Sequence, residues 1–166
     1  MAIQTPSLQF SVMCLDLVEE EKRPPTLQYL FYELPFPSLP FQMDRFHVIN
    51  CWANGRGDFK QSVKILTPSK DKVFIETGEQ AFTLEDPYTP QLMINVFQEL
   101  QFEEEGHYWV QNFLDGKLVL EYPLTIRVIQ SAKQEPKLET KLESKNEKKP
   151  SSLPTSLGLD EWNIPK

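Results

Sequence analysis

The chain has 166 residues, a net charge of −7, 14 prolines and six glycines. This length suits one domain with an appendage, and the acidic balance argues against general nucleic-acid binding, which needs a cationic face. No stretch approaches the roughly 18 apolar residues of a membrane span, and the first residues lack the basic start and apolar run of a secretory signal. We therefore expect a cytoplasmic protein that binds neither nucleic acid nor a membrane.

Short strand patterns separated by turn residues recur along the first 132 residues. Low glycine and high proline content is typical of short strands with irregular connections rather than long helices. In chain order, the predicted strands cover residues 8–18, 26–34, 42–53, 61–66, 72–76, 81–84 and 91–102, followed by two more within 104–129. Spacings of this kind predict an all-β protein, an antiparallel Greek-key β-sandwich that is either immunoglobulin-like or jelly-roll-like.

The first predicted strand carries Phe10, Val12, Cys14 and Asp16 at alternate positions, so these side chains share one face. Cys14 and Cys51 are the only cysteines, and each lies within an apolar strand. A free cysteine in that setting behaves as a small hydrophobic residue. We expect both thiols to be buried and reduced.

Aromatic residues are concentrated between residues 29 and 46, on either side of the proline-spaced segment 35–40. The six are Tyr29, Phe31, Tyr32, Phe36, Phe41 and Phe46. Most are expected in the core, and the prolines predict an extended connection. If some of the rings line one side, they would form an apolar patch for a partner segment or a small apolar ligand.

Two later segments have patterns that decide between kinds of local structure. Residues 91–101 place Leu92, Asn95, Val96 and Glu99 at helical spacing, but their β-branched and aromatic content favours a strand over a short helix. Residues 67–72 connect two strand patterns through Pro68-Ser69-Lys70-Asp71 and predict a hairpin.

The segment 104–129 carries the strongest fold signal. Asp115-Gly116 between two apolar runs predicts a tight hairpin, because both central residues of the favoured turn need positive φ. Gly106 and Tyr108 have the spacing of a tyrosine corner, in which the phenol anchors the connection that enters a strand. Pro123 cannot donate to a ladder, so we expect it at a sheet edge or a bulge.

The composition changes after residue 132. Residues 1–132 hold 10 Lys/Arg against 18 Asp/Glu, whereas residues 133–150 hold six Lys against four Glu and no aromatic residue. We predict a domain over 5–132, a disordered Lys/Glu-rich linker over 133–152, and a C-terminal linear motif over 153–166. The motif carries four large apolar side chains that are candidates for partner binding, namely Leu157, Leu159, Trp162 and Ile164.

No residue pattern in the chain indicates catalysis. His47 and His107 have no Cys or His spacing that would complete a metal site, so we expect ordinary surface or half-buried positions. The acidic corner 103–105 could approach Asp86 or Asp115, as in calcium-binding loops, but its successive side chains point in different directions. The tripeptide 56–58 matches an adhesion motif and is expected to be a tight turn.

Three stretches resemble a small uncharacterised bacterial family of β-sandwich proteins, a domain of unknown function. They are FSVMCLD near the start, the W-x-N-G-x-G turn at 52–57 followed by QSVKIL, and EEGHYWVQNFLDGKLVLEYPL near the end. The resemblance covers residues 8–129 and implies a β-sandwich. It implies no catalytic or binding residue.

The leading functional hypothesis is a non-enzymatic protein-binding or adaptor module without a cofactor. The alternative is a sandwich that binds a small ligand or a metal through an end loop or an aromatic face. The leading hypothesis rests on a complete strand pattern that contains no activated nucleophile and on the C-terminal segment around Trp162.

Overall fold

The computed structural model describes residues 3–19, 21 and 23–129, and within them the chain forms strands and no helix. The ten strands are β1 Ser7–Val18, β2 Thr26–Phe31, β3 Glu33–Phe36, β4 Phe41–Ala53, β5 Gly57–Leu66, β6 Val73–Glu76, β7 Gln80–Leu84, β8 Gln91–Phe102, β9 Gly106–Leu114 and β10 Lys117–Val128. The all-β prediction is confirmed. The predicted tail and its candidate residues lie outside the described residues.

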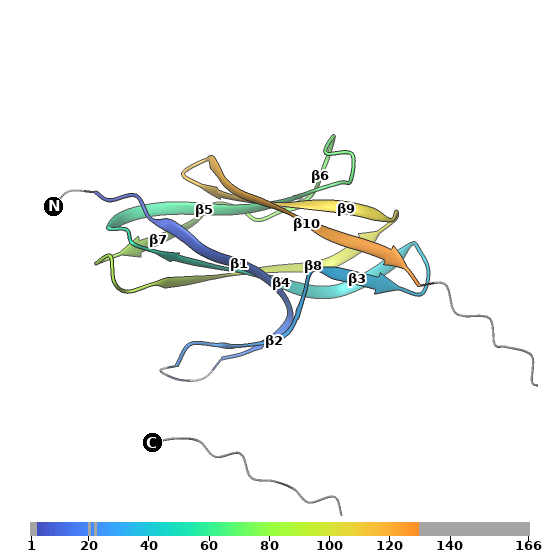
Figure 1. Cartoon of the computed structure of the whole chain (residues 1–166), viewed down its shortest axis with the longest axis horizontal. Coiled ribbons are helices and arrows are strands. Elements are labelled where there is room, and N and C mark those ends of the chain that lie inside the picture. The colour runs from blue at the N-terminus through green and yellow to red at the C-terminus, as the bar shows by residue number, and fades with distance from the viewer. Residues whose placement is uncertain (1–2, 20, 22, 130–166) are drawn as a thin grey trace, which may run out of the picture. The chain divides into compact units, whose positions relative to one another are not determined.

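The strands form two sheets that face each other (Figure 1). One sheet has the order β2-β1-β4-β8, and the other has the order β3-β10-β9-β5-β6, with β7 also paired to β5. All pairs are antiparallel except β3 with β10. The predicted sandwich is therefore confirmed, with one parallel pair that the sequence did not indicate.

The segment 26–34, which we predicted as one strand, is two strands in different sheets. β2 pairs with β1 up to Phe31 opposite Met13, and the chain then crosses to the other sheet at Tyr32. There β3 runs parallel to β10, and its Pro35 lies opposite Arg127. The single-strand prediction was wrong, because local composition does not reveal a change of sheet. The predicted extended segment 35–40 begins inside β3.

Residues 91–102 form strand β8, so the strand interpretation is confirmed over the helical one. β8 pairs with β4 from Gln91 opposite Trp52 to Phe102 opposite Phe41 without a register shift. Tertiary pairing of this length overrides the helical spacing of a few apolar residues. The hairpin over Pro68 to Asp71 is also confirmed, joining β5 to β6.

The inner faces of the sheets form two apolar clusters. The larger is built around Phe46, Phe97, Phe102 and Tyr108, and the smaller around Trp52 with rings of β5 and β7. Every one of these five side chains is at most 2 % exposed. Large aromatic side chains stabilise such a core most per residue, because each buries the greatest apolar area.

The two turn predictions in 104–129 are confirmed. Asp115 and Gly116 have φ values of 46° and 75°, and the turn joins β9 to β10. The Tyr108 hydroxyl donates to the Glu104 carbonyl at 3.4 Å across the corner that enters β9. Gly106 has a φ of 142° at that corner, a conformation that side chains rarely adopt.

Phe10, Val12 and Cys14 share one face of β1, as expected, and it is the outer face, since Met13 is the β1 residue in the main core. One local expectation needs correction. The tripeptide 56–58 is not a turn, because Arg56 pairs with Gln4 and residues 57–58 begin β5.

Candidate binding pocket at the open side of the sandwich

The two sheets leave one side of the sandwich partly uncovered. β2 pairs only with residues 13–18 of β1, and β3 pairs only with residues 125–128 of β10. Residues 7–12 and 117–124 are consequently free sheet edges on the same side, with the Tyr32 crossover between them. Figure 1 shows β2 turning away from its sheet and β3 lying beside the end of β10.

A pocket of about 260 Å³ lies at this crossover. Its lining comes from three strands and the crossover, namely Ser11, Val12, Met13, Leu30, Phe31, Tyr32, Tyr122 and Pro123. Most of these side chains are apolar, and two at the rim are strongly exposed, Leu30 at 62 % and Tyr32 at 75 %. An apolar hollow with a few convergent polar groups is the usual form of a binding site.

Two hydroxyl groups form the polar part of the pocket. Ser11 Oγ and Tyr122 OH lie 2.9 Å apart, and Ser11 Oγ donates to Asn112 Oδ1 at 3.4 Å. Burial raises the pKa of Tyr122 to about 12, although hydrogen bonds with Ser11 and Asn112 act to lower it. The phenol is therefore neutral at physiological pH and can both donate and accept a hydrogen bond.

Behind the hydroxyls, a seam of buried amides runs between the sheets. Gln61 Oε1 accepts from Trp52 Nε1 at 2.9 Å and from Asn50 Nδ2 at 3.0 Å, and Gln61 Nε2 donates to Asn95 Oδ1 at 3.0 Å. All four side chains are at most 1 % exposed. The seam joins β4, β5 and β8, and it fixes the relative position of the sheets that frame the pocket.

Two amide atoms at the pocket end of this seam have no hydrogen-bond partner. They are Asn50 Oδ1 and Asn112 Nδ2, an acceptor and a donor. Both residues neighbour Ser11, since Asn50 lies opposite it in the β1–β4 register and Asn112 accepts its hydroxyl. Both atoms are buried next to Ser11 and outside the pocket lining, so they are unsatisfied polar groups beside the pocket and not binding groups within it.

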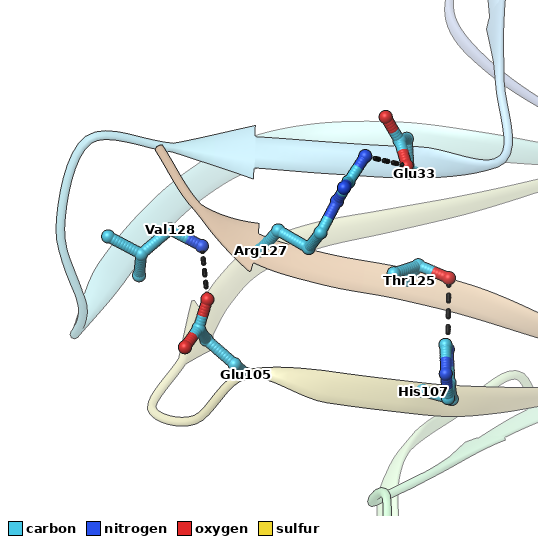
Figure 2. Close-up of polar contacts among 6 residues, drawn as sticks. All are labelled: Glu33, Glu105, His107, Thr125, Arg127 and Val128. Carbon is cyan, nitrogen blue, oxygen red and sulfur yellow. Dashed lines mark hydrogen bonds and ion pairs between the residues drawn. The ribbon is translucent and has the colours of Figure 1, made fainter. Parts of the chain in front are cut away.

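The crossover is held in place by side-chain contacts at the end of β10 (Figure 2). Arg127 Nη2 donates to Glu33 Oε2 at 2.5 Å, and the backbone N–H of Thr125 donates to the Tyr32 carbonyl at 3.1 Å. On the other side of β10, Glu105 Oε1 accepts from the backbone N–H of Val128 at 2.5 Å. These contacts attach β3 and the entry to β9 to β10. Tyr32 directly precedes β3, so its position beside β10 is fixed.

Pro123 explains where the pairing of β10 with β3 stops. The outward N–H groups of Thr125 and Ile129 donate to Tyr32 and Phe36 carbonyls, and Pro123 is the next residue upstream on that side. It has no N–H to donate, so the ladder ends there. Pro123 lies opposite Trp109 on the other side of β10, which confirms the predicted edge position.

The histidines lie apart from the pocket. His107 is exposed, and its Nδ1 lies 3.0 Å from Thr125 Oγ1 (Figure 2), in line with the expected surface position. His47 is only 5 % exposed, on the outer face of β4 opposite Cys14, and its Nδ1 has no hydrogen-bond partner. The expectation for His47 was wrong, because β1 and β8 flank it on both sides.

The acidic groups considered for calcium make other contacts. Asp86 accepts from the backbone N–H of Tyr88 and Thr89, and Asp115 accepts from the backbone N–H of Lys60. Tyr88 and Thr89 hydrogen bonds lower the pKa of Asp86. In the described part of the chain, no three His, Cys, Asp or Glu side chains gather as metal ligands.

The aromatic cluster divides between core and surface. Phe36 and Phe46 are buried, and Phe31 and Phe41 pack against the core. Tyr29 and Tyr32 are exposed. Phe31 and Tyr32 line the pocket, so part of the cluster forms the apolar patch that was one of the two expectations.

The sequence interpretation missed the polar residues of the site. Ser11 lies 101 positions before Asn112 and 111 before Tyr122, and only the approach of β1 to the β9–β10 hairpin brings it to them. A usable signal was present, because Asn50, Gln61, Asn95 and Asn112 are amides in the middle of apolar strands. Buried amides in such positions require hydrogen-bond partners from other strands.

Both cysteines are free and buried, as expected. Burial raises the pKa of Cys14, with a further contribution from nearby Asp16, and burial alone raises the pKa of Cys51. A thiol with a raised pKa is a poor nucleophile.

In the described residues, no helix is long and apolar enough to cross a bilayer.

Comparison with known proteins gives a family but no activity. No curated protein matches the chain. Among solved structures, the chain is similar to the Pseudomonas fluorescens alkylpurine DNA glycosylase AlkC bound to DNA containing an abasic site analog, with 10 % identity and a TM-score of 0.43. That similarity covers 58 % of this chain and only 28 % of the glycosylase. A family model matches residues 9–127, and the chain therefore belongs to DUF6941, a family of unknown function.

Proposed function

We propose that the chain is a non-enzymatic, cytoplasmic protein-binding module whose side pocket takes an apolar anchor side chain of a partner segment. The observation that carries this proposal is the apolar pocket at the crossover, with Leu30 and Tyr32 exposed at its rim. Interfaces commonly centre on one aromatic or aliphatic side chain that fills a preformed hollow.

The size and setting of the pocket support a side chain over a free small molecule. Its volume of about 260 Å³ is below the range of roughly 300–1,000 Å³ that is usual for small-molecule sites. Apart from Tyr32 at the crossover, its lining residues belong to strands, so little ordering is needed when a partner binds.

The net negative charge of residues 1–132 indicates which charge the partner segment should carry. Residues 1–132 carry eight more acidic than basic side chains, 18 against 10. A segment with Lys or Arg around its apolar anchor would be drawn to this surface faster than an acidic one. We therefore expect the preferred partner segment to be apolar at its centre and basic at its flanks.

The test is selection from a random peptide library on the immobilised full-length chain, followed by affinity measurement on variants. Enriched peptides should share an apolar residue with basic neighbours, and Tyr32→Ala or Leu30→Ser should weaken their binding about tenfold or more. Tyr88→Ala is the matched control, because Tyr88 is 90 % exposed and lies outside the pocket. Equal losses in Tyr32→Ala and Tyr88→Ala would refute the pocket as the binding site.

The C-terminal segment remains a separate hypothesis for partner binding. Leu157, Leu159, Trp162 and Ile164 form an apolar group that a partner could bind as a linear motif. Pull-down from the protein's own cells would compare the full chain with a version that ends at Pro150. Identical partner sets would remove the terminal segment from the proposal and leave the pocket as the tested site.

The small-ligand alternative is distinguished by native mass spectrometry of the purified full chain. A bound species that is released by Tyr32→Ala would assign the pocket to a small molecule instead of a protein segment. Elemental analysis of the same sample addresses the metal alternative.

A further inference from the structure

Strand β8 presents a second free edge, on the other side of the sandwich. β8 is the last strand of its sheet and pairs on one side with β4. Within the described residues, no strand pairs with its other side. The outward backbone groups of this twelve-residue strand therefore have no strand partner, although the carbonyls of Leu92 and Met93 accept side-chain hydrogen bonds from Gln91 and Asn95.

The other edges of the sandwich are short or interrupted. β3 and β6 have four residues each, β7 has five and β2 has six. The free part of β1 contains a register shift between Leu8 and Phe10. The free part of β10 contains Pro123 and a register shift between Leu118 and Leu120. Proteins limit unwanted strand pairing by such devices, and β8 has neither a proline nor a register shift.

The first eight residues of β8 are also free of charge. The only ionisable residue of the strand is Glu99, whose φ of 53° bends the backbone near the strand's end. Residues 91–98 thus form an uncharged edge on a body with a net charge of −8 through residue 132. Beside this segment, Glu19 and Arg23 of the β1–β2 connection line a pocket with Leu92 and Ile94, so the charges next to the edge are one of each sign.

The apolar side chains on the outer face of this segment are arranged symmetrically about Ile94. Leu92, Ile94 and Val96 lie on the outer face, opposite Cys51, Ile49 and His47 of β4. An antiparallel pair of β8 strands with its two-fold axis at Ile94 would place Leu92 across from Val96 of the other copy. Apolar cross-strand pairs of this kind stabilise antiparallel sheets, and a two-fold interface requires such self-complementarity.

We propose that the free edge of β8 is a self-association surface, on which a second copy of this chain pairs through residues 91–98. The four-stranded sheets of two copies then form one continuous eight-stranded sheet. This surface is separate from the side pocket, so the inference does not rest on the proposed protein-binding function. A pair of copies would present two such pockets.

The test is sedimentation velocity of the full-length chain over a range of concentrations. The wild-type chain should form dimers, and Val96→Lys should weaken association about tenfold or more, because a lysine would be placed against apolar side chains. Val119→Lys is the matched control, since Val96 and Val119 are both 45 % exposed on edge strands. The control variant should retain the dimer.

Hydrogen exchange of the wild-type chain provides a second test that needs no variant. Amides of residues 91–98 should exchange more slowly at high than at low protein concentration. A monomer at every concentration, or exchange in β8 that is independent of concentration, would overturn the proposal. So would a dimer that Val119→Lys or truncation at Pro150 dissociates while Val96→Lys does not.

Discussion

Ser11 and Tyr122 join the two sheets through their hydroxyl groups, which lie 2.9 Å apart at the polar end of the side pocket. Ser11 belongs to β1 and Tyr122 to β10, so the contact bridges two strands that are not neighbours in either sheet. The contact lies where β1 no longer pairs with β2 and β10 no longer pairs with β3. The bond therefore holds the sandwich together at the place where backbone pairing does not.

Tyr122→Phe should destabilise the protein by about 1–2 kcal/mol, because it removes the hydroxyl partner of Ser11 without removing the ring from the core. Urea unfolding measures this loss. Tyr88→Phe is the control and should change the unfolding free energy by less than about 0.5 kcal/mol, since exposed groups far from packed contacts contribute little. Equal effects of the two substitutions would show that the Ser11 contact contributes nothing to stability.

Alkaline pH should destabilise the protein through Tyr122. Burial raises the pKa of Tyr122 to about 12, whereas the unfolded chain has a pKa near 10, so the unfolded state loses its proton first. The contribution is complete below about pH 10 and is lost as the pH rises toward 12. Unfolding free energies measured across this range should fall less steeply for Tyr122→Phe than for wild type. Parallel curves would contradict the assignment.

Gln61→Leu should be among the most destabilising single substitutions. Gln61 serves Asn50, Trp52 and Asn95, and its loss would leave three buried polar groups without a partner. At about 1–3 kcal/mol for each orphaned group, the total loss should be at least about 3 kcal/mol. Gln42→Leu at an exposed position of β4 is the control in the same denaturation experiment. A loss near that of the control would mean that water replaces the Gln61 amide.

Most strands were predictable because their signals are local. The Asp115-Gly116 turn requires positive φ at both residues, and its flanking apolar runs determine two strands. Tyr108 likewise follows Gly106 at the spacing of a corner that the Glu104 carbonyl completes. In these cases neighbouring residues carry all the information that the local structure needs.

The pocket was not predictable because it depends on a change of sheet. Tyr32 leaves β2 and pairs with Thr125, a residue 93 positions later. Nothing local at Tyr32 distinguishes this crossover from a continuous strand. The buried amides gave an indirect signal, since an amide in an apolar strand needs a partner, but the sequence does not say which strand provides it.

Gly106→Ala should destabilise the corner that precedes β9. Gly106 has a φ of 142°, and a Cβ there would lie 2.9 Å from Pro68 Cγ, so backbone strain and a steric clash act together. We expect a loss of about 1–3 kcal/mol. Gly78→Ala is the matched control, because a Cβ at Gly78 meets nothing within 4 Å. The control should be neutral or stabilising by up to about 1 kcal/mol. Thermal unfolding of both variants measures the difference. A Gly106→Ala variant that unfolds at a higher temperature than Gly78→Ala would show that the backbone of the corner relaxes.

Native protein should resist thiol labelling, although neither cysteine is in a disulfide. Cys14 and Cys51 are at most 4 % exposed, and burial raises the pKa of both thiols, so little thiolate is available at neutral pH. Reaction with a maleimide should be slow in buffer and complete in urea, with two thiols labelled per chain. Rapid labelling of Cys51 alone would indicate that β1 separates locally from β4, because Phe10 lies opposite Cys51 in that pair. Such opening would also expose the β1 backbone beside Ser11. Because Tyr122→Phe lacks the hydroxyl contact to Ser11, it should then accelerate the labelling of Cys51.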